Sequence, residues 1–131
     1  AVVVTMVLRA VRREVLGAVP EGVYRVDRSA EYLIEKGLDS QTAHQLSGIV
    51  TLTFENGRWL DHRRTVTDCS GSYSVEGGRI FLRLDVAQCG EPAGTIVMSA
   101  RWALKDGQLR FLDIRNGRPL EWGGKPWTKI D

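Results

Sequence analysis

Tight-turn signals recur between short alternating runs of the chain, and this recurrence constrains the fold more than any other feature. Asn56-Gly57 separates IVTLTF from RWLDHRRTV, and the glycines of Glu76-Gly77-Gly78 separate GSYSV from RIFLRLDVA. The KDGQ turn at 105–108 then separates TIVMSARWAL from LRFLDI. Asn-Gly between alternating runs is typical of two-residue hairpin turns, because such turns need positive φ at their central residues. The sequence therefore predicts an antiparallel meander.

The remaining strands follow from the flanking segments. GVYRVD at 22–27 predicts a first strand, and LEWGGKPWTKI after Asn116-Gly117 predicts a final strand in which Gly123-Gly124 forms a bulge or turn. A meander of this kind must hide its two edge strands, and closing into a barrel removes both edges. We therefore predict a mainly β fold, an antiparallel up-and-down barrel of about eight strands, in preference to an open sheet or a sandwich.

Three helices are expected around this sheet. Ser29 is a good N-cap for AEYLIEKG, and Asp39 or Ser40 can cap a second short helix over 39–46. These two short helices follow the first strand and should close one end of the barrel. From Val4 to Val19 apolar residues recur at three- and four-residue spacing, which predicts an amphipathic N-terminal helix that Gly17 and Pro20 terminate.

The chain accordingly divides into an N-terminal helical segment, 1–19, and a barrel domain, 20–131. The apolar stripe of the helix needs a partner surface, so the segment is expected to act as a lid over the barrel, a plug in it or a homodimer contact. These three alternatives stay open. Residues 1–131 are few enough for one barrel domain and enough for a single core without a metal.

Composition argues against several partners. The 18 basic and 16 acidic residues leave a net charge of +2, which predicts no nucleic-acid binding, and the arginine pairs at 12–13 and 63–64 are expected to face solvent. No apolar run reaches the ~18 residues of a membrane span. With two cysteines and no Cys-x-x-Cys, no metal site is predicted, and no cofactor-binding motif occurs.

The two cysteines flank the second hairpin. If that hairpin turns at Gly77, Cys69 faces a position near Asp85 and Cys89 lies just beyond it. A modest bend would bring the two Cα atoms into the roughly 4.4–6.8 Å range of a disulfide. We therefore predict a Cys69–Cys89 bond, which would favour a secreted or extracytoplasmic protein. The alternative is two buried thiols in a cytoplasmic barrel.

Strand parity indicates which residues line the interior. In RIFLRLDVA the apolar Ile80, Leu82 and Leu84 share one face, while Arg83 and Asp85 lie on the other and should face solvent. The interior residues form either a plain core or the walls of a pocket for a flexible apolar ligand. The candidate ligand-binding residues are Tyr24, Leu52, Phe54, Trp59, Tyr73, Leu82, Leu84, Met98, Trp102 and Phe111.

Catalytic residues are not assigned. His44 lies on a short predicted helix and should be at the surface, while His62 neighbours Asp61 on a strand. Adjacent strand residues face opposite ways, so Asp61 and His62 should not form a working pair, and a His–carboxylate dyad would need a cross-strand partner. No Gly-x-Ser-x-Gly elbow or glycine-rich phosphate loop is present.

Five segments in this order resemble a known family: GVYRVDRSAEYLIEKGLD, GIVTLTFENGRW, CSGSYSVEGGRI, RWALKDGQLRFLDI and KPWTKI. They look like the lipocalin-like (calycin-type) β-barrel domain of actinobacterial proteins, including one fused behind extracellular solute-binding modules. The resemblance covers about residues 20–131. It implies a cavity for a small apolar molecule, and some stand-alone bacterial members are cofactor-free cyclases that act on polyketide chains.

Two functions from different classes are therefore expected. The first is a binding module that encloses a small hydrophobic molecule. The second is a cofactor-independent cyclase of bacterial natural-product biosynthesis, which would close a ring or perform a cycloaddition on a polyketide-type substrate and would be cytoplasmic. Such catalysis leaves no motif, because positioning alone lowers the barrier. An interaction domain with a filled core is the third possibility, and whether the chain is an enzyme stays open.

Overall fold

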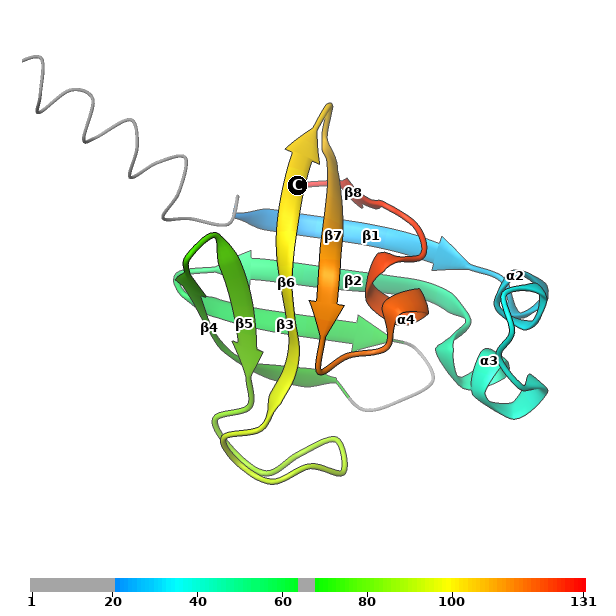
Figure 1. Cartoon of the computed structure of the whole chain (residues 1–131), viewed down its shortest axis with the longest axis horizontal. Coiled ribbons are helices and arrows are strands. Elements are labelled where there is room, and N and C mark those ends of the chain that lie inside the picture. Colours follow the sequence, from blue (N-terminus) through cyan, green and yellow to red (C-terminus); the bar gives the residue numbers. More distant parts are fainter. Residues whose placement is uncertain (1–20, 64–67) are drawn as a thin grey trace, which may run out of the picture.

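Eight antiparallel strands close into an up-and-down barrel whose spatial order is the order of the sequence (Figure 1). The computed structural model describes residues 21–63 and 68–131. The strands are β1 Gly22–Arg28, β2 Gly48–Glu55, β3 Arg58–Arg63, β4 Cys69–Glu76, β5 Arg79–Arg83, β6 Ile96–Lys105, β7 Gln108–Arg115 and β8 Trp127–Lys129. The predicted mainly β closed barrel is thereby confirmed. The predicted N-terminal helix and the whole of the 1–19 segment lie outside the described residues.

The predicted turns adopt the backbone that hairpins require. Asn56 and Gly57 have φ of 51° and 76°, and Gly77 and Gly78 have φ of 59° and 78°. These hairpin turns lie at one end of the barrel, which we call the turn end.

The short strand β8 closes the barrel by pairing with both β1 and β7, for example Tyr24 opposite Lys129.

The opposite end carries the helices, and we call it the helical end. The two short helices predicted after the first strand are present as α2 Ala30–Glu35 and α3 Ser40–Leu46. Ser29 Oγ accepts a hydrogen bond of 3.0 Å from the Tyr32 amide, and Asp39 Oδ2 accepts one of 3.0 Å from the Thr42 amide. Both predicted N-caps are therefore confirmed, with Asp39 rather than Ser40 capping the second helix.

A third helix replaces part of the predicted final strand. Residues Pro119–Gly123 form α4, with the proline in its first turn, as is common at helix starts. Gly123 is the last residue of this helix and Gly124 is its C-cap, with φ −66°. The prediction that Gly123-Gly124 forms a bulge or turn within a final strand is therefore wrong. No helical period is visible in this segment, because a five-residue helix buries only Trp122. Trp127 Nε1 donates to the Trp122 carbonyl oxygen at 2.9 Å and fixes α4 to β8.

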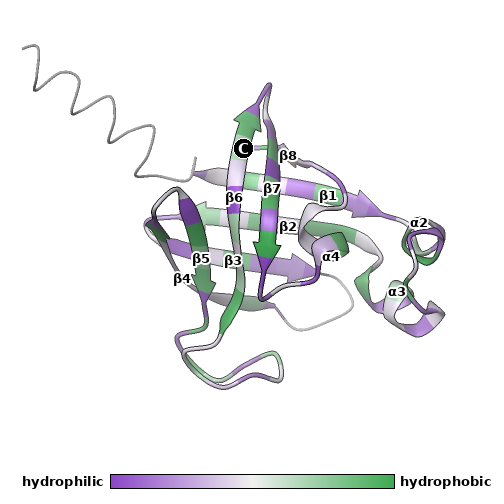
Figure 2. Ribbon diagram, in the orientation of Figure 1, coloured by the Kyte–Doolittle hydropathy of each residue, from purple (hydrophilic) through white to green (hydrophobic). Residues whose placement is uncertain are grey.

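The core fills the barrel with the apolar face of each strand, and the hydropathy alternates along the strands (Figure 2). Of the residues with predicted parity, Leu82, Leu84 and Met98 are fully buried, whereas Arg83 and Asp85 are exposed as expected. In β7 a bulge interrupts the alternation at Asp113, whose φ is 49°. Ile114 consequently packs against the core rather than facing solvent.

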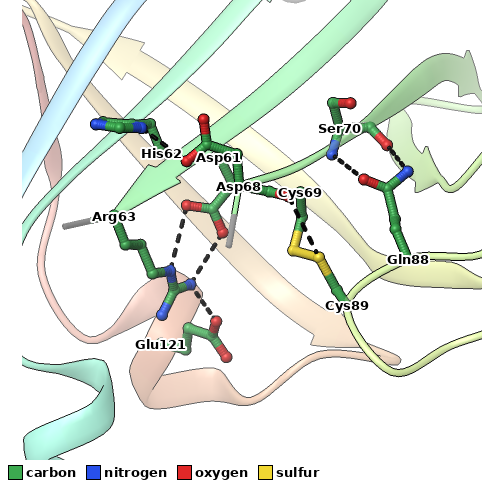
Figure 3. The surroundings of a disulfide bond; sticks show 9 residues. All are labelled: Asp61, His62, Arg63, Asp68, Cys69, Ser70, Gln88, Cys89 and Glu121. Carbon is green, nitrogen blue, oxygen red and sulfur yellow. Dashed lines mark hydrogen bonds and ion pairs between the residues drawn. A yellow bond between two sulfur atoms is a disulfide. The ribbon is translucent and has the colours of Figure 1, made fainter. Parts of the chain in front are cut away.

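The predicted disulfide is present. Cys69 and Cys89 are bonded with a Cα–Cα distance of 6.2 Å, and the bond ties the Leu84–Thr95 loop to the first residue of β4. Gln88 ties the same loop a second time (Figure 3), because its amide accepts from Ser70 N at 3.1 Å and donates to Ser70 O at 2.8 Å. The loop is therefore attached by a covalent and a hydrogen-bonded clamp.

Replacing both Cys69 and Cys89 with serine should lower the free energy of unfolding by about 3 kcal/mol, because the bond closes a loop of 20 residues in the unfolded chain. Urea denaturation measures this difference. Wild-type protein unfolded in dithiothreitol should match the variant, and thiol titration of the unreduced unfolded protein should find no free cysteine. Two titratable thiols would contradict the bond.

Candidate functional site

A cavity of about 740 Å³ opens at the helical end of the barrel. It lies between the end of β3, the start of β4 and β6, the disulfide and α4. Its lining is divided into an apolar wall and a set of polar and charged groups. The lining residues are Trp59, Asp61, Arg63, Cys69, Cys89, Val97, Asn116, Gly117, Arg118, Glu121 and Trp122.

Strand β3 contributes three inward-facing residues, Trp59, Asp61 and Arg63, which alternate with the exposed Arg58, Leu60 and His62. Sequence analysis placed Arg63 in a solvated arginine pair, and this prediction is wrong. The Arg63 guanidinium is buried because the parity that points Trp59 into the barrel also points Asp61 and Arg63 inward.

An ionic triad forms the polar part of the cavity (Figure 3). Arg63 donates from Nε and Nη2 to the two carboxylate oxygens of Asp61, at 3.3 and 3.0 Å, and from Nη2 to Oε1 of Glu121 on α4. A buried charge is tolerated only when it is paired, and here one guanidinium serves two carboxylates. The triad Asp61–Arg63–Glu121 therefore joins the barrel wall to α4.

A second buried arginine supports the triad from the end of β1. Arg28 is almost completely buried, and its Nη1 donates to the Glu121 carbonyl oxygen. Its guanidinium lies 6.0 Å from the centre of the Trp127 ring. Its Nε and Nη2 have no hydrogen-bond partner among the described residues. The two arginines and two carboxylates of this cluster, Arg28, Arg63, Asp61 and Glu121, thus balance each other in charge.

Burial and pairing oppose each other in this cluster. Desolvation raises the pKa of Asp61 above its ordinary value, although the charge of Arg63 acts in the opposite direction. Desolvation also lowers the pKa of Arg28, and the charge of Arg63 lowers it further. For Arg63, desolvation would lower the pKa, but the carboxylates of Asp61 and Glu121 outweigh it and the pKa is raised. Arg63 is therefore the firmly charged centre of the triad.

The apolar wall is held in place by its own contacts. Trp59 Nε1 donates to the Arg83 carbonyl oxygen at 3.2 Å, which fixes the indole against β5. Trp122 packs against Trp127 with ring centres 6.2 Å apart, and against Phe111 at 6.3 Å. Val97 and the disulfide complete the wall. The wall is thus preformed, as is usual for small-molecule sites.

The histidine that sequence analysis singled out has a carboxylate partner. His62 Nδ1 lies 2.7 Å from Asp68 Oδ1, and both side chains are about half exposed on the outside of the barrel. Asp61, the sequence neighbour of His62, points inward to Arg63 instead, as the strand parity predicts. The neighbouring Cys69 is oxidised, so it offers no thiol nucleophile to this dyad. His44 is exposed, with Nδ1 2.7 Å from the Ser40 carbonyl oxygen.

The ten candidate ligand-binding residues fall into three groups. Trp59 lines the cavity. Tyr73 and Trp102 are partly buried against the core. The remaining seven are buried within the core itself: Tyr24, Leu52, Phe54, Leu82, Leu84, Met98 and Phe111. The aromatic rings among them contact one another, for example Phe54 and Tyr73 at 5.3 Å between centres.

Most of the cavity lining was not recognised in the sequence. Asp61 and Arg63 could have been found from parity alone, because they follow Trp59 at a spacing of two. Glu121 and Trp122 could not, because they belong to a helix that carries no sequence period. Asn116 and Arg118 lie in the connection to that helix and were missed for the same reason.

Comparisons of the chain with protein-family models, with curated proteins and with solved structures found no match. Within residues 21–63 and 68–131, no helix has the length and apolar character needed to cross a membrane. In the same described part of the chain, no three His, Cys, Asp or Glu side chains are grouped so that they could hold a metal ion.

Proposed function

We propose that this barrel, of the lipocalin-like type, binds one small and largely apolar molecule in the cavity at its helical end. The observation that carries the proposal is the cavity itself, whose volume of about 740 Å³ falls within the range of small-molecule sites, roughly 300–1,000 Å³. Its wall of two tryptophans, a valine and a disulfide suits an apolar body. The ligand is therefore expected to lie beside α4, between Trp59 and Trp122.

The polar groups of the cavity indicate that the ligand also carries a polar group. Asp61 and Arg63 form an ion pair with each other, so these two charged groups are already paired without a ligand. The side chains of Asn116 and Arg118 line the cavity without a hydrogen bond or ion pair to any described residue. These two residues are thus available to a carbonyl or hydroxyl oxygen of the ligand at the rim.

A variant that fills the cavity tests the proposal. Val97→Trp places an indole in the cavity, and it should weaken binding of a neutral fluorescent probe, N-phenyl-1-naphthylamine, at least tenfold. Energy transfer from the tryptophans to the bound probe provides the measurement. A neutral probe is needed because charged dyes also bind to exposed arginines.

Val86→Trp is the matched control, because it adds the same indole to an exposed position of the neighbouring loop, outside the cavity lining. This control should bind the probe as the wild-type protein does. Equal probe affinity in the Val97→Trp and Val86→Trp proteins would contradict the proposal, as would a wild-type protein that binds no probe.

Cofactor-independent ring closure is the second candidate function. The observation in its favour is Asp61, a carboxyl group in the cavity whose pKa is raised by burial, beside Arg63 and opposite an apolar wall. An enclosure that folds a flexible polyketide-type chain can accelerate its cyclisation by positioning alone. A linear polyene incubated with the protein should then yield a cyclic isomer of unchanged mass, resolved by chromatography. If the protein binds the polyene but no new isomer appears, the cyclase function is contradicted and only the binding function remains.

A further inference from the structure

Positive charge is concentrated on one wall of the barrel. The outer surface of strands β5, β6 and β7 carries six cationic side chains and a single carboxylate, Asp113, a net charge of +5 on a chain whose net charge is +2. A second carboxylate, Asp106, lies in the turn between β6 and β7. We call the cationic side chains the basic face: Arg79, Arg83, Arg101, Lys105, Arg110 and Arg115. None of them lines the cavity beside α4.

Strand pairing makes this face continuous. Arg79 on β5 lies directly opposite Arg101 on β6, Arg101 lies opposite Leu112 on β7, and Ala103 lies opposite Arg110. Ile80, Met98 and Phe111 alternate with these residues and point into the core. Hydrophilic stretches of the β5 and β7 ribbons are visible in Figure 2. Arginines from three adjacent strands therefore share one outer surface.

Most of the charge on this face is not neutralised. Asp113 forms ion pairs with both Arg79 and Arg115. The other four cations, Arg83, Arg101, Lys105 and Arg110, form no ion pair with a described residue, although a hydrogen bond from Ser72 and, less strongly, the charge of Arg83 lower the pKa of Asp85. Asp113 thus neutralises Arg79, which lies directly opposite Arg101, so the charge that is available to an anionic partner lies on the other four cations.

One exposed aliphatic side chain lies among these cations, and another lies near the tip of the β6–β7 hairpin. Leu112, opposite Arg101, is 49% exposed. Leu104 is 41% exposed near the tip, although it lies opposite the buried Leu109 and therefore on the other face of β6 from Arg101 and Lys105. The tip of this hairpin projects at the top of Figure 1. Exposed leucines flanked by arginine and lysine match the interface of an anionic bilayer, where aliphatic groups enter the headgroup boundary and cations meet the phosphates.

A nucleic acid fits this surface less well. Proteins that bind single strands stack the bases on exposed aromatic rings, whereas the one aromatic residue on this face, Phe81, is half-buried. A barrel wall is also convex and offers no groove for a backbone. The exposed Leu112 among the cations and the exposed Leu104 near the hairpin tip therefore favour lipid over nucleic acid.

We propose that the basic face is a docking surface for anionic phospholipid bilayers, which places the barrel flat against a membrane on β5–β7 and the β6–β7 tip. The cavity at the helical end stays open in this orientation, since its lining lies outside the docking surface. Peripheral attachment of this kind needs no spanning helix. It depends on charge, so salt weakens it.

Vesicle co-sedimentation of the full chain tests the proposal. The wild-type protein should bind vesicles of phosphatidylcholine with 30% phosphatidylserine and should not bind pure phosphatidylcholine. The double variant Arg101→Glu/Arg110→Glu should bind the anionic vesicles at least tenfold more weakly, because each cation near such a surface contributes about a fivefold change in affinity. Failure of the wild-type protein to bind anionic vesicles would overturn the proposal.

Two further variants test whether vesicle binding depends on the basic face itself or only on the net charge of the protein. Arg25→Glu/Lys36→Glu makes the same change in net charge on β1 and beyond the end of α2, and it should retain the wild-type affinity within twofold. An equal loss of vesicle affinity in the two double variants would overturn the proposal that the basic face is the docking surface. Leu112→Ser leaves every charge in place and should weaken vesicle binding about threefold or more. Unchanged vesicle binding by Leu112→Ser, or tighter binding to a single-stranded oligonucleotide than to vesicles at the same salt, would overturn the assignment to lipid.

Discussion

Replacing Arg63 with methionine should lower the free energy of unfolding by about 3–5 kcal/mol, one of the two largest effects that we expect from a single substitution. The Asp61 side chain is only 5% exposed, and Arg63 donates to both of its carboxylate oxygens. Removing the guanidinium leaves a buried carboxylate without its main partner and frees Glu121 on α4. Urea denaturation at pH 7 measures the loss.

The pH dependence of the variant identifies the cause. Without Arg63, burial raises the pKa of Asp61 in the folded state further above its value in the unfolded chain. Between these two pKa values the folded state binds more protons than the unfolded state, so stability falls as the pH rises and recovers as the pH is lowered. The deficit of Arg63→Met should therefore shrink on acidification from pH 7 towards the ordinary carboxyl range.

The double variant Asp61→Leu/Arg63→Met is the control. Replacing both members of a buried pair with apolar groups of similar size is often nearly neutral, so most of the lost stability should return. A single variant as stable as the wild-type protein, or a deficit that does not change with pH, would show that the triad does not hold α4 to the barrel.

Local chemistry made much of the barrel predictable. The glycines of the Asn56-Gly57 and Gly77-Gly78 turns adopt the positive φ that only a few residues tolerate, so each turn identified its hairpin without knowledge of the rest of the chain. The cap at Ser29 acts over three residues and was predicted correctly, and Asp39 was one of the two candidates for the second cap. Once the hairpin register followed from its turn, the disulfide between Cys69 and Cys89 followed as well.

Features that depend on distant residues were not predictable. A charge on a strand is normally solvated, so Arg63 was placed outside, although the parity of β3 points it inward. Its ion pair with Glu121, 58 residues further along the chain, depends on a distant residue and could not be predicted. Helix α4 is stabilised by the packing of Trp122 on Trp127 rather than by any local period. The net charge of +2 concealed the basic face, because acidic residues on other parts of the barrel cancel it in the sum.

Replacing Gly71 with alanine should also cost about 3 kcal/mol or more, because no space exists for one added carbon. Gly71 lies in β4 opposite Trp59, and a Cβ atom there would be 1.8 Å from the carbonyl oxygen of Arg83 and 3.1 Å from Trp59 Nε1. Both of the atoms in the hydrogen bond that holds Trp59 would be displaced, and one of them is backbone. The strands β4 and β5 would have to separate at the edge of the cavity.

Urea denaturation followed by tryptophan fluorescence measures this loss and reports on Trp59 at the same time. Ser74→Ala is the matched control, since it changes an exposed residue of the same strand and should alter stability by less than about 0.5 kcal/mol. Because the wall of the cavity would shift with Trp59, Gly71→Ala should also weaken N-phenyl-1-naphthylamine binding under conditions where the variant is folded. A Gly71→Ala protein as stable as Ser74→Ala would contradict this packing. It would mean that the space between Gly71 and the Arg83 carbonyl oxygen is large enough for a methyl group.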